Sequence, residues 1–278
     1  MTAVTSGRRA RNRVARNKDL LGAATEIIVR DGLEGLTMQA VADSVGCAVG
    51  TIYTYFDSKS ALLSALQVAA IQTLIATFGS SSESWETAIS QADLEPDAAA
   101  LIRLVAIGQL FIAAGDVHEH EFDLLQMLIS TPKDLTSDQD REAVIPLALG
   151  LLDTVRVLID QAILAGALTL SSSDSAVNRA VRWAGGLNGA LLVSNVGIDD
   201  QRKVASLFDG NVLALRLADD LLLGWGASQT NLESAHRFVD HLIATDQLIA
   251  QPADSVIDLT ETMASPARSI ILSDYLSD

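Results

Sequence analysis

Apolar residues recur at the spacing of a helix face along most of this chain, and Gly, Pro, Ser or Asp residues punctuate the pattern. No segment alternates apolar and polar residues as a half-buried strand does, and no repeat of fixed period is present. Leucine and alanine are abundant and both favour helix. The periodicity therefore predicts an all-α fold. Beyond the first 97 residues the expected helices cover about 98–114, 119–130, 139–166, 174–195, 200–223 and 229–248.

The chain has 278 residues, of which 49% are hydrophobic and only 4% aromatic. This length can bury one large or two ordinary cores, and the composition predicts that they are mostly aliphatic. A single cysteine, Cys47, excludes an intramolecular disulfide. The most apolar stretch, 183–198, is short and interrupted by polar residues, and no apolar segment follows the basic N-terminus. We expect no membrane span and a cytoplasmic protein.

Charge is divided unevenly between the two ends of the chain. The formal net charge is −16, yet residues 1–66 hold eight Lys and Arg against six Asp and Glu. The excess of negative charge therefore lies in residues 67–278. Such an asymmetry predicts that the N-terminal end meets a polyanion and that the rest does not.

The basic end has the pattern of two short helices joined by a tight turn. A helix over 16–31 ends at Gly32, and the next helix begins after Thr37, a good N-cap residue, and ends at Gly46. Only two residues separate it from the segment "VGTIYTYF". This arrangement predicts a helix-turn-helix whose second helix reads DNA. Asp57 or Ser58 is expected to cap a fourth, long helix.

Composition suggests four parts. Residues 1–15 form a basic flexible arm, 16–66 the DNA-binding domain, 67–248 a larger helical domain and 249–278 an irregular tail. A serine-rich and acidic stretch over 79–98 is expected to interrupt the helices, apart from one short turn around Trp85. The arm has no acid between Arg8 and Lys18. It either lies along the DNA backbone or in an adjacent minor groove, or is a disordered solubilising tail.

Residues 16–66 resemble the DNA-binding domain of the TetR family of transcriptional regulators. The resemblance rests on "LLGAATEIIVRDGLEGLT", "MQAVADSVGCAVGTIYTYF" and "DSKSALLSAL". Within these segments the family's order of glycine, glycine-threonine, tyrosine, phenylalanine, lysine and leucine is matched by Gly46, Gly50, Thr51, Tyr53, Phe56, Lys59 and Leu62. The resemblance covers about a fifth of the chain. The rest of the chain resembles the family only in being helical and of suitable length.

The resemblance implies a set of DNA-contacting residues, and physical chemistry gives each a role. Gly50 allows close approach to the groove, and Val49 and Thr51 can reach base edges. Tyr53 and Tyr55 offer phenolic donors to phosphate, while Ile52 and Phe56 should face inward. Thr37 and Lys59 stand at helix starts that can each hold a phosphate. By resemblance, Gln39 is a further contact.

Two positions depart from the family pattern. The family usually has serine or threonine where Ala48 stands, so the reading helix lacks a side-chain cap worth about 1 kcal/mol. Tyr55 stands where a histidine is often found.

Other candidate sites carry weaker signals. Cys47 could sense oxidants from within the turn, or could simply be a small buried residue there. "HEHEF" (118–122) offers metal-ligand types, but no second cluster accompanies it, and its acids suit a helix start. "GGLNG" (185–189) lacks the preceding strand of a dinucleotide loop, so its glycines favour close helix packing. We therefore predict no metal, no cofactor and no enzymatic activity.

The resemblance implies a ligand-responsive regulator. A homodimer formed through about 174–223 would bind a palindromic double-stranded DNA operator, and a small apolar effector, held in an aliphatic pocket, would release it as a repressor. The alternative is a helical small-molecule sensor or enzyme-like domain that retains a vestigial DNA-binding head, as the large second domain and Ala48 suggest.

Overall fold

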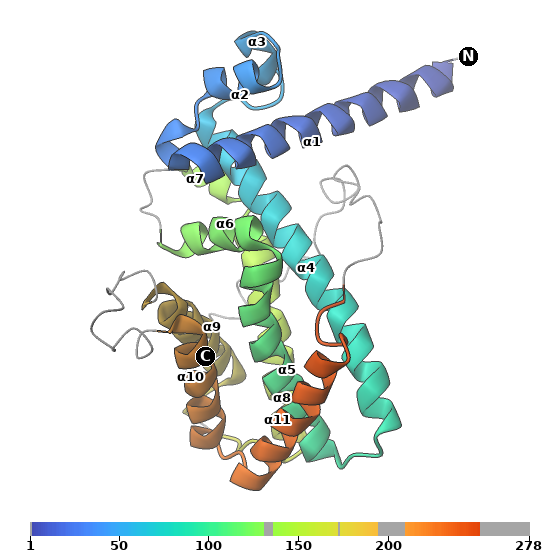
Figure 1. Cartoon of the computed structure of the whole chain (residues 1–278), viewed down its shortest axis with the longest axis vertical. Helices are drawn as coiled ribbons and strands as arrows, with labels where there is room; N and C mark the ends of the chain where they lie inside the picture. The colour runs from blue at the N-terminus through green and yellow to red at the C-terminus, as the bar shows by residue number, and fades with distance from the viewer. Residues whose placement is uncertain (1, 131–135, 172, 194–208, 251–278) are drawn as a thin grey trace. The chain divides into compact units, whose positions relative to one another are not determined.

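The computed structural model describes residues 2–130, 136–171, 173–193 and 209–250, which form helices joined by short connections and contain no strand (Figure 1). The predicted all-α class is confirmed for these residues. In chain order the helices are α1 (Thr2–Gly35), α2 (Met38–Ser44), α3 (Val49–Ile52), α4 (Lys59–Gln91), α5 (Pro96–Val117), α6 (Glu119–Ser130), α7 (Asp138–Arg141), α8 (Ile145–Leu164), α9 (Ala176–Val193), α10 (Gly210–Gly224) and α11 (Gln229–Ala244).

The chain divides into two compact units. Of the described residues, 2–69 and 136–146 form the first unit, and 70–130 with 147–250 form the second. The first division falls close to the predicted boundary after residue 66. Residues 136–146, predicted to belong to the larger domain, group with the first unit instead. The predicted tail, 249–278, lies almost entirely outside the described residues.

In the first unit, α1 is much longer than predicted. Its backbone is helical from Thr2, so the predicted flexible arm over 1–15 is wrong for the described residues of that stretch. Alanine and arginine are good helix formers, and extending a helix that is already nucleated adds a hydrogen bond for each residue fixed. The buried stripe Leu20, Ala24 and Ile27 supplies that nucleus. At Gly32 the backbone takes φ 72°, which kinks the helix where the sequence predicted its end.

Residues 136–146 are fastened to the start of α4 by side chains of the first unit. The Ser60 hydroxyl accepts a hydrogen bond from the Ser137 N–H, at 2.8 Å, and donates to the carboxylate of Asp140. The Ser137 hydroxyl donates to the same Asp140 oxygen, at 2.6 Å. The predicted single helix over 139–166 is divided here into α7 and α8, because Pro146 cannot continue a helix from the N-terminal side but fits the first turn of a new one.

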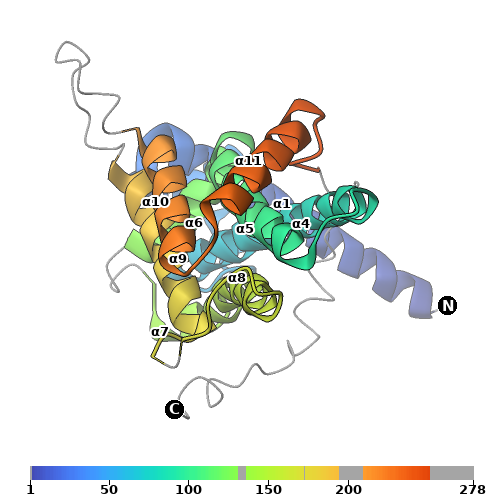
Figure 2. The same cartoon turned by 90° about the horizontal axis from the view of Figure 1, so that it is seen from below.

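The second unit is built around α5, whose residues are buried on nearly every side (Figure 2). The remaining core comes from α4, α8, α9, α10 and α11. The predicted interruption over 79–98 is wrong, since α4 continues to Gln91. Ser81, Trp85 and Ile89 follow each other at helical spacing and are all buried, and Trp85 donates its indole N–H to the Leu248 carbonyl at 2.9 Å. Packing thus overrides the low helix propensity of the serine run.

Within the described ranges, two helices, α4 and α5, are long and apolar enough to cross a membrane by length and composition alone. However, 67% of the relevant stretch of α5 is buried inside the protein, as in the core helix of a packed unit. The candidate considered from the sequence, 183–198, is not among them.

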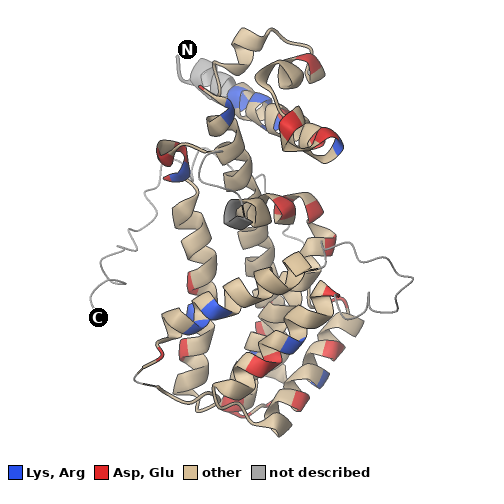
Figure 3. Ribbon diagram, turned by 90° about the vertical axis from the view of Figure 1, so that its left-hand side faces the viewer, with Lys and Arg blue, Asp and Glu red and all other residues tan. Residues whose placement is uncertain are grey.

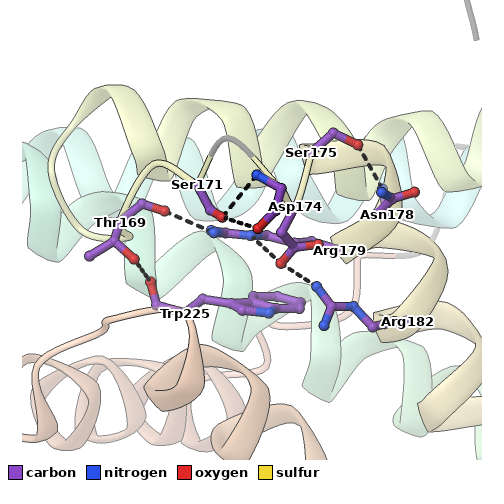
Figure 4. A network of polar contacts seen from close by, with 9 residues as sticks. Thr169, Ser171, Asp174, Ser175, Asn178, Arg179, Arg182 and Trp225 are labelled. Carbon is purple, nitrogen blue, oxygen red and sulfur yellow. Dashed lines mark hydrogen bonds and ion pairs between the residues drawn. The ribbon is translucent and has the colours of Figure 1, made fainter. Parts of the chain in front are cut away.

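A polar network joins the connection before α9 to the end of α10 (Figure 4). Arg179 is only 2% exposed, yet its guanidinium donates to Asp174 and to the Thr169 carbonyl and lies over the Trp225 ring, 5.5 Å from the ring centre. Thr169 donates both its N–H and its hydroxyl to the Trp225 carbonyl, each at 2.8 Å. The network thus links the residues before α9 to the C-terminal end of α10, while the Nη1 atom of Arg179 is buried without a hydrogen-bond partner among the described residues.

Candidate nucleic-acid interface

The turn between α2 and α3 has the geometry of a helix-turn-helix. The hydroxyl of Thr37 accepts a hydrogen bond from the Ala40 N–H at 3.0 Å and so caps α2. After α2, Gly46 adopts φ 65°, a left-handed conformation that suits glycine, and the Cys47 N–H returns to the Ala42 carbonyl at 2.9 Å. Cys47 is half-buried and carries a free thiol.

The reading helix α3 is a single turn, Val49–Ile52, followed by hydrogen-bonded turns up to Phe56. Ile52 and Phe56 are buried, as predicted. Because they anchor one side of the segment, the other side is left accessible: Gly50 and Tyr53 are exposed, Tyr53 by 50%, and Val49, Thr51 and Tyr55 are half-buried. A rigidly seated helix that leaves one face exposed can present that face to a DNA groove.

The N-cap residue of α3 is Ala48, and the expected absence of a side-chain cap there is confirmed. Its backbone is extended like that of any N-cap residue, but no side-chain hydrogen bond is made there. The Thr51 N–H bonds the Ala48 carbonyl at 2.8 Å instead. The start of the reading helix therefore depends on backbone bonds and on the anchors Ile52 and Phe56.

Three of the residues predicted to contact DNA already have partners inside the first unit. The Thr37 hydroxyl serves as the cap of α2, and the Gln39 amide donates to Asp43 at 2.7 Å. The Lys59 ammonium donates to the Leu33 carbonyl at 2.9 Å. Each group keeps further capacity, since an ammonium has three donors, a hydroxyl its own proton and a carboxamide a second N–H.

Four cations occur within two turns of α1, namely Arg11, Arg13, Arg16 and Lys18, and Figure 3 shows this basic run on the helix. The Arg13 guanidinium lies over the ring of Tyr55, 5.9 Å from its centre. This contact brings the basic run to the segment that follows the reading helix. The sequence did not predict this contact, because the arm was expected to be flexible. Arg13 reaches Tyr55 only because the helix continues without a break from residue 16 back to Arg13.

No metal centre is evident among the described residues, because no group of three His, Cys, Asp or Glu side chains is gathered there. In the "HEHEF" segment, the ring of His118 shares a hydrogen bond with the Thr77 hydroxyl at 2.9 Å. Of the glycines in "GGLNG", Gly186 fulfils the packing role, since a Cβ there would lie 2.8 Å from a methyl group of Leu217 on α10.

The second unit contains a cavity of about 320 Å³, within the size range of sites for small molecules. Its wall is contributed by α4, α5, α6, α8 and α9. The pocket was expected to be aliphatic, but its wall is partly aromatic, because Phe78, Phe111, Phe122 and Trp183 all line it. Phe111 and Phe122 meet edge to face, with ring centres 5.1 Å apart. Four of the twelve aromatic residues of the chain therefore line this cavity.

One face of α9 is exposed and carries small or apolar residues. Val181 is 51% and Leu192 38% exposed, and Gly185 and Gly189 lie between them at helical spacing. A Cβ added at either glycine would meet nothing within 4 Å inside the chain. This face can therefore receive another helix at close range, and its residues Val181 and Gly185 also belong to the cavity wall. Residues 194–208, part of the predicted dimer segment, lie outside the described residues.

Residues 20–66 match the family model of bacterial regulatory proteins of the tetR family. A comparison with curated proteins finds no match. Among solved structures, a TetR-family regulator from Agrobacterium tumefaciens is 19% identical with a TM-score of 0.51, over 74% of this chain and 97% of that one. The fatty acid degradation regulator FadR from Bacillus halodurans is 15% identical with a TM-score of 0.52, over 76% and 97%. A putative TetR-family regulator from Mesorhizobium loti is 17% identical with a TM-score of 0.50, over 77% and 99%. These structures share the fold.

Proposed function

We propose that this chain, a transcriptional regulator of the TetR family, is a repressor that binds a palindromic operator as a homodimer and leaves it when a small apolar effector binds. The observation that carries the proposal is the seating of α3: Ile52 and Phe56 are buried, so Gly50, Thr51 and Tyr53 face outward together. A cavity with an apolar wall in the second unit supports the effector.

Five residues of the reading segment have a role in this proposal. Gly50 lets the backbone approach the groove, and Val49 and Thr51 touch base edges, Thr51 by hydrogen bond or by its methyl group. Tyr53 and Tyr55 donate to phosphates, with Arg13 adding positive charge beside Tyr55.

The residues that flank the reading segment hold the backbone of the duplex. Thr37 and Gln39 contact it from α2, and Lys59 from the start of α4. Their internal hydrogen bonds fix the direction of each side chain before DNA arrives, which lowers the entropy lost on binding.

Dimerisation is proposed to use the exposed face of α9, together with α10. A two-fold axis places the same face on both partners, and two reading heads then meet half-sites about one helical turn of DNA apart or a multiple of that distance. Gly185 and Gly189 allow close helix contact across this interface.

Effector binding is proposed to favour a conformation whose reading heads no longer fit the operator. The ligand can shift this equilibrium only by binding the two conformations with different affinity. Because α4 and α8 each contribute residues to both units, a change in the cavity wall has a covalent route to the first unit. We further propose that the protein acts in the cytoplasm and has no enzymatic activity of its own.

The test is fluorescence anisotropy with labelled duplexes from the DNA that flanks the protein's own gene. Specific binding should survive an excess of unrelated duplex and should weaken steeply with salt, because phosphate contacts release counterions. Equal affinity for flanking and unrelated DNA, measured with folded dimer at low salt, would count against the proposal.

A further inference from the structure

We infer that the effector is a neutral, mainly apolar molecule with one hydrogen-bond donor, and that Asn188 of α9 is the residue that selects it. This inference rests on the proposed effector function and names the chemical class that the cavity takes.

The orientation of the Asn188 carboxamide is fixed by its own helix. Its Nδ2 donates to the Ala184 carbonyl at 2.7 Å. The Ala184 oxygen can only accept, so the nitrogen of the carboxamide must face it and the oxygen must point elsewhere. The side chain of Asn188 is 5% exposed and belongs to the cavity wall.

The Asn188 Oδ1 atom is buried and has no hydrogen-bond partner among the described residues. A buried acceptor without a partner is costly, and buried polar groups are normally hydrogen-bonded. A hydrogen-bond donor on a bound molecule would give the Asn188 oxygen its missing partner. The cavity therefore carries one unused acceptor in an otherwise apolar wall.

The other wall residues disfavour charged ligands. Apart from Asn188, the described wall carries two side chains with polar atoms. The Thr154 hydroxyl donates to the Gly150 carbonyl at 3.2 Å, and Trp183 has an indole N–H, which can only donate. No Asp, Glu, Lys, Arg or His is among these wall residues. A charged ligand would lose its hydration without gaining a counter-charge, so the cavity favours a neutral one.

The aromatic wall residues suit a planar apolar body. Phe78, Phe111, Phe122 and Trp183 can pack against a ring, and Trp183 also offers an intrinsic fluorescence signal. A suitable probe pair is 1-naphthol and 1-methoxynaphthalene. The two share one ring system, but only the first can donate a hydrogen bond.

The experiment measures the affinity of both probes by tryptophan fluorescence and calorimetry, with wild-type protein and the Asn188→Leu variant. Wild type should bind 1-naphthol more tightly than the ether, and the ratio of the two affinities should fall by about threefold to tenfold in the variant, as expected for one hydrogen bond. The extra methyl group of the ether adds apolar area, so area alone would favour the opposite order.

Asn178→Leu is the matched control, because Asn178 lies on the same helix, is exposed and is outside the wall. It should leave the affinity ratio unchanged. Equal binding of both probes by wild type, an unchanged ratio in Asn188→Leu, or no binding of either probe would overturn the inference. The wild-type comparison needs no variant, so it decides even if Asn188→Leu folds poorly.

These outcomes are distinguishable from failure of the proposed function. Operator affinity measured without any probe should be the same for wild type and Asn188→Leu. If the operator is bound but the probes are not discriminated, only the inference about Asn188 fails. If wild type shows no specific DNA binding, the proposed regulatory function fails whatever the probes do.

Discussion

The ammonium group of Lys59 donates a hydrogen bond to the backbone carbonyl of Leu33, with 2.9 Å between the two atoms. It ties the first residue of α4 to the segment that follows the kink in α1. The same group is proposed to hold a DNA phosphate. The bond uses one of three ammonium protons, so both roles can be filled together, and the side chain is held in place before DNA is met.

Replacing Lys59 should separate these two roles. Lys59→Ala should weaken binding to all DNA sequences alike and lower the slope of log affinity against log salt by about 1, as expected for one lost phosphate contact. Because the side chain is exposed, the free energy of unfolding should fall by no more than about 1 kcal/mol. Anisotropy over a salt series and urea unfolding measure the two quantities. Lys59→Arg, which keeps the charge, should retain most of the affinity, and an unchanged salt slope in Lys59→Ala would contradict the phosphate contact.

Gly50→Ala tests the close approach of the reading helix to DNA. A Cβ at this position meets nothing within 4 Å inside the chain, so folding should be unaffected or stabilised by up to about 1 kcal/mol. Affinity for the operator should fall at least about tenfold, since the added methyl group would stand between helix and groove.

The control for Gly50→Ala is Gly22→Ala, at another exposed helical glycine with open space around it. Thermal unfolding and anisotropy should show similar stability for both variants and lost DNA affinity only for Gly50→Ala. Wild-type affinity in Gly50→Ala would exclude close backbone approach at this residue.

Gly189→Glu tests the dimer interface on α9. Inside one chain the new side chain starts in open space on an exposed face, so the protomer should fold. In the proposed dimer the two-fold axis would bring two buried carboxylates together, which should raise the dissociation constant at least about a hundredfold. Sedimentation equilibrium measures this, with Gly79→Glu as the control at an exposed glycine of α4. A dimer as tight as wild type would place the interface elsewhere.

His236 of α11 should make stability depend on pH. Its hydrogen bond with the Asp219 carboxylate, at 2.8 Å, raises the pKa of His236 above its ordinary value. Since the pKa is higher in the folded chain, the stabilisation is complete below the ordinary histidine pKa of about 6.5 and is lost as pH rises through the folded value. The loss of unfolding free energy in His236→Gln should therefore be larger at about pH 5.5 than at about pH 8.5. Urea unfolding checks this, and in an Asp219→Asn background the pH dependence of that loss should become smaller, with the charge of Asp240 still raising the pKa of His236.

The sequence allowed the helical class, the helix-turn-helix and much of its core to be predicted, because these depend on local spacing. Ile52 and Phe56, for example, are buried as their positions in the reading segment indicated. The family resemblance is likewise confirmed by the match over residues 20–66. The DNA contacts themselves stay predictions.

What could not be predicted depends on packing between distant residues. The serine run at 80–82 is helical because Ser81 and Trp85 bond and pack against the segment around Leu248. Residues 136–146 join the first unit through Ser60, which lies far away in the sequence. The aromatic wall arises because Phe78, Phe111 and Trp183, on three different helices, converge on one cavity. No local sequence pattern predicts such contacts between distant residues.

Selection of binding sites from a random duplex library tests the central claim, that two copies of this reading head bind a symmetric operator. The enriched sequences should be inverted repeats whose half-site centres are about 10 base pairs apart, or a multiple of that. The Gly50→Ala protein, taken through the same selection, should enrich nothing. Enrichment of a single unsymmetric site by wild type, or no enrichment at low salt, would contradict the claim.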